Sequence, residues 1–209
     1  MAALNRAGLI RRAFHLEWLT VGWLVVEAAV AIGSGLAAGS LSLVAFGADS
    51  EIELASAGVL LWRLRVELLH GEEFSKAIER QASRAAAALL FALTAYVAAS
   101  AGYGFWHRQG QEFSIPGFGV AAAAVPTMYF LAMEKRRIAE QIDSFALRAD
   151  KAESVACCYL STAVVAGLLA QLLFGAWWID GATSIVIIGF LLKEGREAWS
   201  AEDSCDDQD

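Results

Sequence analysis

The sequence has few of the residues from which soluble proteins build cross-links and solvated surfaces. Its 209 residues include three cysteines, two prolines and three histidines, and only 19% of them are charged. Three cysteines cannot form a disulfide framework, and no Cys-x-x-Cys pair or cluster of cysteine and histidine indicates structural zinc. The net charge is −7, and no basic cluster remains once the loops are assigned, which argues against a nucleic-acid partner.

Hydrophobic residues are abundant instead, and they fall in long blocks. They make up 57% of the chain, and the mean hydropathy is +0.49. A helix needs about 20 apolar residues to cross the hydrocarbon core of a membrane. The stretch between Glu17 and Arg63 carries only four charged residues, all of them acidic. The small residues of Gly33–Ser42 favour a turn, so this stretch predicts two spans.

The rest of the chain predicts four further spans. Residues 85–106 and 113–133 form the third and fourth. Residues 154–192 contain one charged residue, and a turn near Gly175 would divide them into the fifth and sixth. The predicted fold class is therefore all-α, a polytopic membrane protein with six transmembrane helices.

Charge distribution predicts the orientation of these helices. With six spans, all of the 16 basic residues except Arg108 fall on the side of the two termini. Because basic residues are enriched in cytoplasmic loops, we expect both termini to be cytoplasmic and the protein to lie in the inner membrane of a cell. Residues 1–200 then form one transmembrane domain, and residues 201–209 form an acidic, disordered tail.

Five acidic residues fall inside the predicted spans, where we expect no lysine or arginine to neutralise them. An ionisable group at the centre of a membrane helix costs at least about 2.5–3.5 kcal/mol, so each is a candidate functional residue. Unpaired carboxylates in a low dielectric must hold protons or bind a cation. Proton-coupled cation transport needs a site that does both. The five are Glu27, Asp49, Glu51, Glu53 and Asp180.

Spacing separates these acids. Asp49 and Glu53 are four residues apart and project from one face of a helix, and Glu153 and Cys157 repeat that spacing in the fifth span. Glu51 lies about 200° around the helix from Asp49 and faces elsewhere. Glu27, Glu51 and Asp180 are candidate auxiliary or proton-coupling acids, although Asp180 would equally serve as a helix cap.

Polar residues line the same helices but carry less weight. Thr20 and Ser34 lie seven residues either side of Glu27, and Ser161 follows Cys157 by four residues. Hydroxyl groups in membrane helices often bond a backbone carbonyl of their own helix, so these stripes do not by themselves identify a site.

Three segments resemble the cation diffusion facilitator family of divalent-metal/proton antiporters, most closely its short bacterial members. They are GSLSLVAFGADSEIELASAG at 39–58, ADKAESVACCYLSTAVVAG at 149–167 and GAWWIDGATSIVIIGFLLKEGREAW at 175–199. The resemblance implies a metal site with two ligands from the second helix and two from the fifth. Those positions correspond to Asp49, Glu53, Glu153 and Cys157. The family usually has His or Asp there, so the last three are departures.

The resemblance has further implications for assembly. The family's cytoplasmic metal-binding domain would be missing, so a homodimer would be held by the membrane domain, with Ala98 and Gly102 as a close-packing pair. Counting at 1.5 Å per residue from the outer ends of the helices places Asp49 roughly 12 Å and Glu153 roughly 30 Å deep, so all four ligands meet only if the helices tilt.

The sequence therefore predicts a transporter that exports a divalent transition metal in exchange for protons, and no enzyme activity. Three oxygens and one thiolate favour zinc, cadmium, cobalt or ferrous iron as the transported ion, with no permanently bound cofactor. Alternatives are an exporter of organic cations using Glu27, Asp49 and Trp23, and a metal-sensing or scaffold membrane protein. An intramembrane aspartyl protease is a weaker one, because Phe46 stands where its motif has glycine.

Overall fold

A computed structural model describes residues 2–70, 76–107, 112–142 and 145–200. The described residues form six α-helices, as the sequence predicts. These are α1 (Ala2–Ala38), α2 (Leu41–His70), α3 (Lys76–His107), α4 (Ile115–Ile142), α5 (Phe145–Phe174) and α6 (Ile179–Ser200). The predicted tail at 201–209 lies outside the described residues.

Two glycines make the tight connections that the sequence predicts. Gly39 has φ = +66° between α1 and α2, and Gly175 has φ = +60° after α5. Glycine adopts this left-handed conformation without the steric penalty of a Cβ atom, and it commonly ends helices for that reason. The amide of Ser40 then donates to the carbonyl of Gly35 at 2.9 Å, which closes the end of α1.

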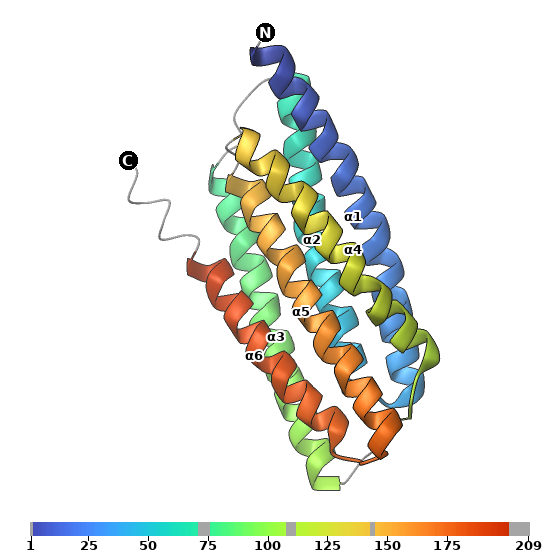
Figure 1. The fold of residues 1–209 in the computed structure, drawn as a ribbon. Coiled ribbons are helices and arrows are strands. Elements are labelled where there is room, and N and C mark those ends of the chain that lie inside the picture. The colour runs from blue at the N-terminus through green and yellow to red at the C-terminus, as the bar shows by residue number, and fades with distance from the viewer. Residues whose placement is uncertain (1, 71–75, 108–111, 143–144, 201–209) are drawn as a thin grey trace.

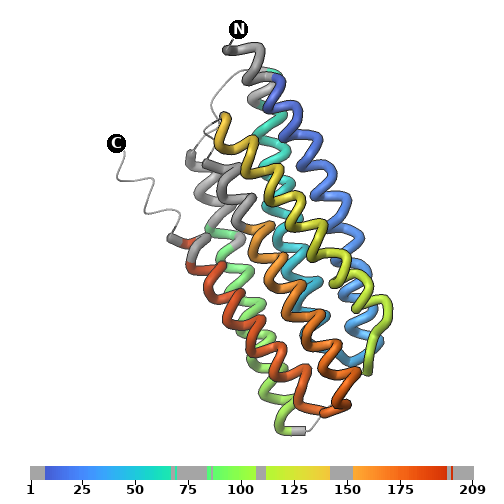
Figure 2. The backbone as a smooth tube through the Cα atoms, in the orientation of Figure 1, coloured from blue at the N-terminus to red at the C-terminus, as the bar shows by residue number. Residues whose placement is uncertain are grey.

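Successive helices alternate in direction, so the start of α1 and the end of α6 lie towards the same end of the bundle (Figure 1). Helix α1 packs on α2 and α4, α4 packs on α5, and α3 packs on α6. Figure 2 shows α2 passing through the middle of this arrangement, and it contacts α1, α3, α5 and α6. Helix α2 is therefore the helix through which the other layers of the bundle are connected.

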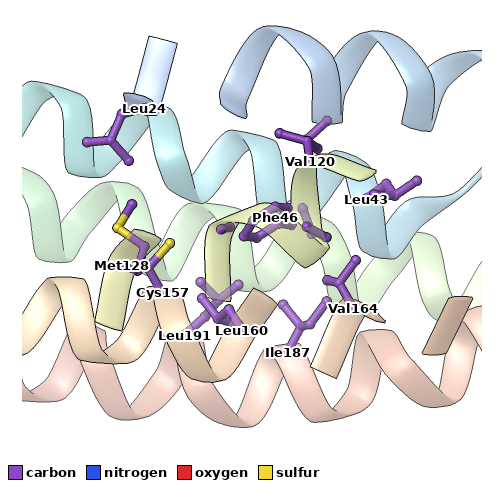
Figure 3. Packing of buried hydrophobic residues seen from close by; sticks show 14 of the residues in the cluster. Leu24, Leu43, Phe46, Val120, Met128, Cys157, Leu160, Val164, Ile187 and Leu191 are labelled. Atoms are coloured by element: carbon purple, nitrogen blue, oxygen red, sulfur yellow. The ribbon is translucent and has the colours of Figure 1, made fainter. Parts of the chain in front are cut away.

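The apolar core follows the inner faces of the helices. Phe46 of α2, Met128 of α4 and Leu160 of α5 are fully buried in one cluster with Cys157, and Met128 lies beside Cys157 (Figure 3). Large apolar side chains also cover the outside of the bundle, including Trp106, Leu173 and Phe174. Such an exterior is typical of a surface that faces lipid.

Four described helices contain stretches long and apolar enough to cross a membrane: residues 8–38, 87–106, 115–141 and 153–174. Helices α2 and α6 do not meet that criterion. Helix α2 has three acids within five residues, Asp49, Glu51 and Glu53, and α6 carries charged residues near both ends. The chain is thus an all-helical, multi-pass membrane protein by its length and composition.

Candidate cation site

Two acids of α2 are buried in the middle of the bundle. Asp49 is 1% exposed and Glu53 is 7% exposed, and both lie on the inward face of α2 near Phe46 and Ala57. Within the described part of the chain, neither carboxylate oxygen of Asp49 has a hydrogen-bond partner, and Oε1 of Glu53 also has none. Buried polar atoms are nearly always paired, so a carboxylate left in this state indicates a place for a proton or a cation.

Helix α5 brings a thiol towards these acids. Cys157 is fully buried, whereas Glu153, one turn earlier, is partly exposed. The acid Glu53 interacts electrostatically with Glu153, and the thiol interacts with both Asp49 and Glu53. Electrostatic interactions therefore connect the two acids of α2 with the two predicted positions of α5.

Glu27 of α1 lies against the same cluster. Its carboxylate is fully buried, and Oε1 accepts hydrogen bonds from Ser50 Oγ at 2.7 Å and from Cys157 Sγ at 3.4 Å. Oε2 accepts a hydrogen bond from Trp23 Nε1, one turn earlier on α1. Glu27 therefore links three helices, α1, α2 and α5, at the level of the buried acids.

A glycine allows α1 to come this close. A Cβ atom on Gly47 of α2 would lie 2.7 Å from Cγ1 of Ile32 and 2.9 Å from its backbone nitrogen. Only a residue without a side chain fits at this crossing. Gly47 stands two residues before Asp49 and three before Ser50, so it sets the distance between α1 and the acids of α2.

The predicted four-ligand arrangement is not assembled. Among the described residues, no three His, Cys, Asp or Glu side chains are gathered closely enough to hold a metal ion. The groups occur in pairs instead. Glu27 accepts a hydrogen bond from Cys157, and Asp49 lies one helical turn before Glu53 on α2. Binding an ion at one point would require movement of side chains or helices, as the different depths of these residues predict.

The other two auxiliary candidates lie apart from the cluster. Glu51 is exposed on the outer face of α2, as its rotation from Asp49 predicts. Asp180 is at the start of α6, where its carboxylate accepts hydrogen bonds from the start of α2. The donors are the amides of Leu41 and Ser42 (2.8 and 3.2 Å) and the hydroxyls of Ser40 and Ser42 (3.0 and 2.6 Å). Asp180 is thus a cap, but of a neighbouring helix.

The hydroxyl groups of the predicted polar stripes donate hydrogen bonds to backbone carbonyls. Thr20 donates to the carbonyl of Leu16 at 3.1 Å, and Ser161 donates to the carbonyl of Cys157 at 2.7 Å. Ser34 makes a longer bond of the same kind to Ala31, at 3.4 Å. These hydroxyls satisfy themselves within their own helices, the outcome that the sequence left open.

A buried basic residue lies beside Glu17, an acid that the sequence did not single out. Lys135 of α4 is fully buried, and its Nζ lies 3.3 Å from Oε2 of Glu17 and 3.3 Å from Oγ of Ser154. From the sequence, Lys135 counted only among the basic residues on the side of the termini, and Glu17 marked the boundary of a charge-poor stretch. Both lie on buried faces, because Lys135 continues the inward row of Met128 and Leu131.

The signal for this pair was present in the spacing. Glu17, Thr20, Leu24 and Glu27 recur at helical intervals and are all buried, so Glu17 belongs to the same face of α1 as Glu27. Glu194 of α6 was also missed, and it interacts electrostatically with Glu53. The end of α6 is rich in charged residues, and nothing in its pattern singles out this glutamate.

Comparison with known proteins identifies the family of the chain. No curated protein matches the chain. Residues 18–201, which include every helix that contributes to the buried acidic cluster, match the family described as the cation efflux transmembrane domain. Proteins of this family move cations across membranes and are not enzymes. The chain belongs to the cation efflux family and is a cation transporter.

Proposed function

We propose that this transporter exports a divalent transition-metal ion from the cytoplasm in exchange for protons. The metal would be bound by Asp49, Glu53, Glu153 and Cys157, which stand at the positions of the family's four ligands. The transported ion is a substrate, so no cofactor is needed for the exchange.

The observation that carries the proposal is the state of Asp49. This carboxylate is almost completely buried, and within the described chain it has neither a hydrogen-bond donor nor an ion-pair partner. A buried carboxylate without a partner is strongly disfavoured in its charged form. It is stable when a proton neutralises it or when a cation occupies the space beside it, and alternation between those two states is metal/proton exchange.

The donor atoms suggest the class of metal. Carboxylate oxygens together with one thiolate suit borderline ions such as zinc, cadmium, cobalt and ferrous iron better than magnesium or calcium. Metal ligands must be deprotonated to bind, so protons compete with the metal at every one of these groups. A site open to the cytoplasm would take up the metal, and protons arriving from the other side would help to release it.

The proposed topology has six spans, with both termini in the cytoplasm and the protein in the inner membrane. The lengths of α2 and α6 support the two additional spans. At 1.5 Å per residue their 30 and 22 residues reach about 45 and about 33 Å, enough for a hydrocarbon core of about 30 Å. Burial of Asp49 and Glu53 within the bundle keeps these charges of α2 away from lipid.

We further propose a homodimer held by the membrane domain. Ala98 and Gly102 of α3 are both exposed, and no atom lies within 4 Å of a Cβ built on Gly102. Small residues four apart on an open helix face allow close approach of a second helix. Cross-linking of cysteines introduced at Ala98 in membranes would test this contact, and failure to form a dimer would exclude it.

Reconstitution into proteoliposomes tests the transport function directly. The full-length protein is assayed with zinc, cadmium, cobalt, ferrous iron, manganese and magnesium under an imposed pH gradient, while metal and proton fluxes are recorded together. We expect borderline metals to move in one direction and protons in the other. The Asp49→Asn variant removes the charge and keeps the shape, so it should fold and lose both fluxes.

Two other outcomes would point to different functions. Competition by bulky hydrophobic cations, together with proton flux that needs no metal, would indicate an exporter of organic cations. Metal binding without flux would indicate a sensor or scaffold. Normal metal flux by a folded Asp49→Asn protein would contradict the site assignment.

A further inference from the structure

Helix α1 meets the candidate cation site through the side chain of Glu27. The family resemblance assigns ligands only to the second and fifth helices, and it gives α1 no part in the site. In the structure, however, the Glu27 carboxylate lies 3.4 Å from the thiol of Cys157 and interacts electrostatically with Asp49 and Glu53. Asp49 and Glu53 act on the thiol electrostatically, whereas Glu27 also accepts a hydrogen bond from it.

The distance between Glu27 and Cys157 is also the distance between two ligands of one metal ion. Zinc binds a thiolate at about 2.3 Å and a carboxylate oxygen at about 2.0–2.2 Å, so two such ligands at a tetrahedral angle lie about 3.5 Å apart. The observed separation of 3.4 Å between Oε1 and Sγ matches this edge. A metal ion could therefore replace the thiol proton with little movement of either atom.

Helix α2 can supply a third ligand. Asp49 is almost fully buried, has no hydrogen-bond partner among the described residues, and interacts electrostatically with both Glu27 and Cys157. Because no hydrogen bond holds its carboxylate, the Asp49 side chain can rotate without breaking one. Asp49 is thus the acid best able to complete a site that already has two of its atoms in place.

We propose that Glu27 is a ligand of the transported metal, so that the site is built by α1, α2 and α5 from Glu27, Asp49 and Cys157. This proposal rests on the proposed function and changes its ligand set. When the metal binds, the Cys157 thiol proton leaves to water as the bond between Sγ and the metal forms. Glu27 and Asp49 contribute carboxylate oxygens, and the ion binds with three protein charges around it.

Two neighbours hold Glu27 in position for this role. Trp23 Nε1 binds Oε2, and Ser50 Oγ binds Oε1 at 2.7 Å, so both oxygens of the carboxylate are oriented. Hydrogen bonds of this kind fix the direction of a ligand and commonly change metal affinity by about 10–100-fold when they are removed. Trp23 and Ser50 are therefore positioning residues, and Trp23→Phe should weaken binding less than Glu27→Gln.

Cadmium binding to the purified full-length protein tests the proposal. Substituting Ala for Cys158 and Cys205 leaves Cys157 as the one thiol, so the ultraviolet charge-transfer absorption of a cadmium–thiolate bond reports this site. In that background, Glu27→Gln should lower the cadmium affinity at least about tenfold, the scale of losses at metal sites. Glu51→Gln, an exposed acid of α2, is the matched control and should bind like the parent.

The comparison of variants separates this proposal from the proposed function. Loss of cadmium binding in Asp49→Asn but parental affinity in Glu27→Gln would overturn the role of Glu27 and leave the transporter's site on α2 and α5. Parental affinity in both would overturn the proposed site as well. Should Glu27→Gln fail to fold, Glu27→Asp keeps the charge with a shorter reach, and an unchanged affinity there would also count against ligation.

Discussion

Two buried charge clusters in this bundle are built in opposite ways. Around Lys135, an ammonium group lies 3.3 Å from the carboxylate of Glu17 and 3.3 Å from the hydroxyl of Ser154, so charges of both signs are buried together. Around Asp49, the nearby groups are the acids Glu27 and Glu53 and the thiol of Cys157. The first cluster is balanced by the protein, and the second has no described cation beside it.

The difference distinguishes a structural charge from a functional one. A balanced pair links α1 to α4 and needs nothing from outside. An acidic cluster without a counter-charge is stable only when protons or a cation complete it. Removal of one charge should therefore have opposite consequences for stability in the two places.

The largest effect should follow from breaking the balanced pair. Lys135→Met keeps the length and apolar stem of the side chain but leaves the Glu17 carboxylate buried without its cation. Loss of one partner from a buried pair typically destabilises a protein by about 3–5 kcal/mol. Denaturation of the purified protein in detergent measures the change, and Arg136→Met, which removes an exposed charge next in sequence, should have little effect.

The double variant Glu17→Leu with Lys135→Met sharpens this result. It removes both charges and leaves no uncompensated ion, so most of the lost stability should return. If the double variant is as unstable as Lys135→Met alone, the pair does not act as a unit, and the contrast between the two clusters would not hold.

Neutralising Asp49 should have the opposite effect on the free energy of unfolding. Asp49→Asn removes an uncompensated buried charge, so the free energy of unfolding should stay at the parental value or rise. The same denaturation measurement applies, ideally without added metal. A large loss of stability would show that Asp49 has a structural partner, as Lys135 does.

A selectivity change should follow at Cys157. Cys157→Asp keeps an anionic group on the same face of α5 and replaces a soft donor with a hard one. We expect the variant to transport, with its preference for cadmium over manganese lowered by about tenfold or more. Cys157→Ala should weaken binding of all metals, cadmium most. Unchanged affinity and selectivity in both variants would identify Cys157 as a packing residue.

The smallest effect is expected at Glu51. It has the same charge as its neighbours Asp49 and Glu53 but is exposed on the outer face of α2. Glu51→Gln should change transport rates by no more than about twofold, as is usual for surface substitutions. An effect as large as that of Asp49→Asn in the flux assay would mean that the two faces of α2 are not functionally distinct.

The sequence predicted the helices better than their ends. Charge-poor stretches located all six helices, and the small residues before Ser42 and at Gly175 located two turns. The third helix was predicted at 85–106 and is Lys76–His107, and the fourth was predicted at 113–133 and is Ile115–Ile142. Hydrophobicity marks the part of a helix that suits lipid, whereas the hydrogen-bonded helix continues beyond it.

The site was predictable where it depends on one helix. Spacing alone placed Asp49 and Glu53 on one face of α2 and Glu51 on a different one. Contacts between helices, such as Glu27 with Cys157 130 residues later, depend on how the helices cross, which no local pattern specifies. Lys135 lies between these cases, because the helical period shared with Met128 and Leu131 could have revealed its burial.

The link made by Asp180 has a consequence for how the protein is made. The amides of Leu41 and Ser42 begin α2, yet the carboxylate that binds them lies 139 and 138 residues later in the chain. While the ribosome synthesises the protein, α2 is made long before Asp180 exists. The start of α2 therefore acquires its cap only after α6 has been made. A chain truncated before α6 would lack this cap even though every residue of α1 and α2 is present.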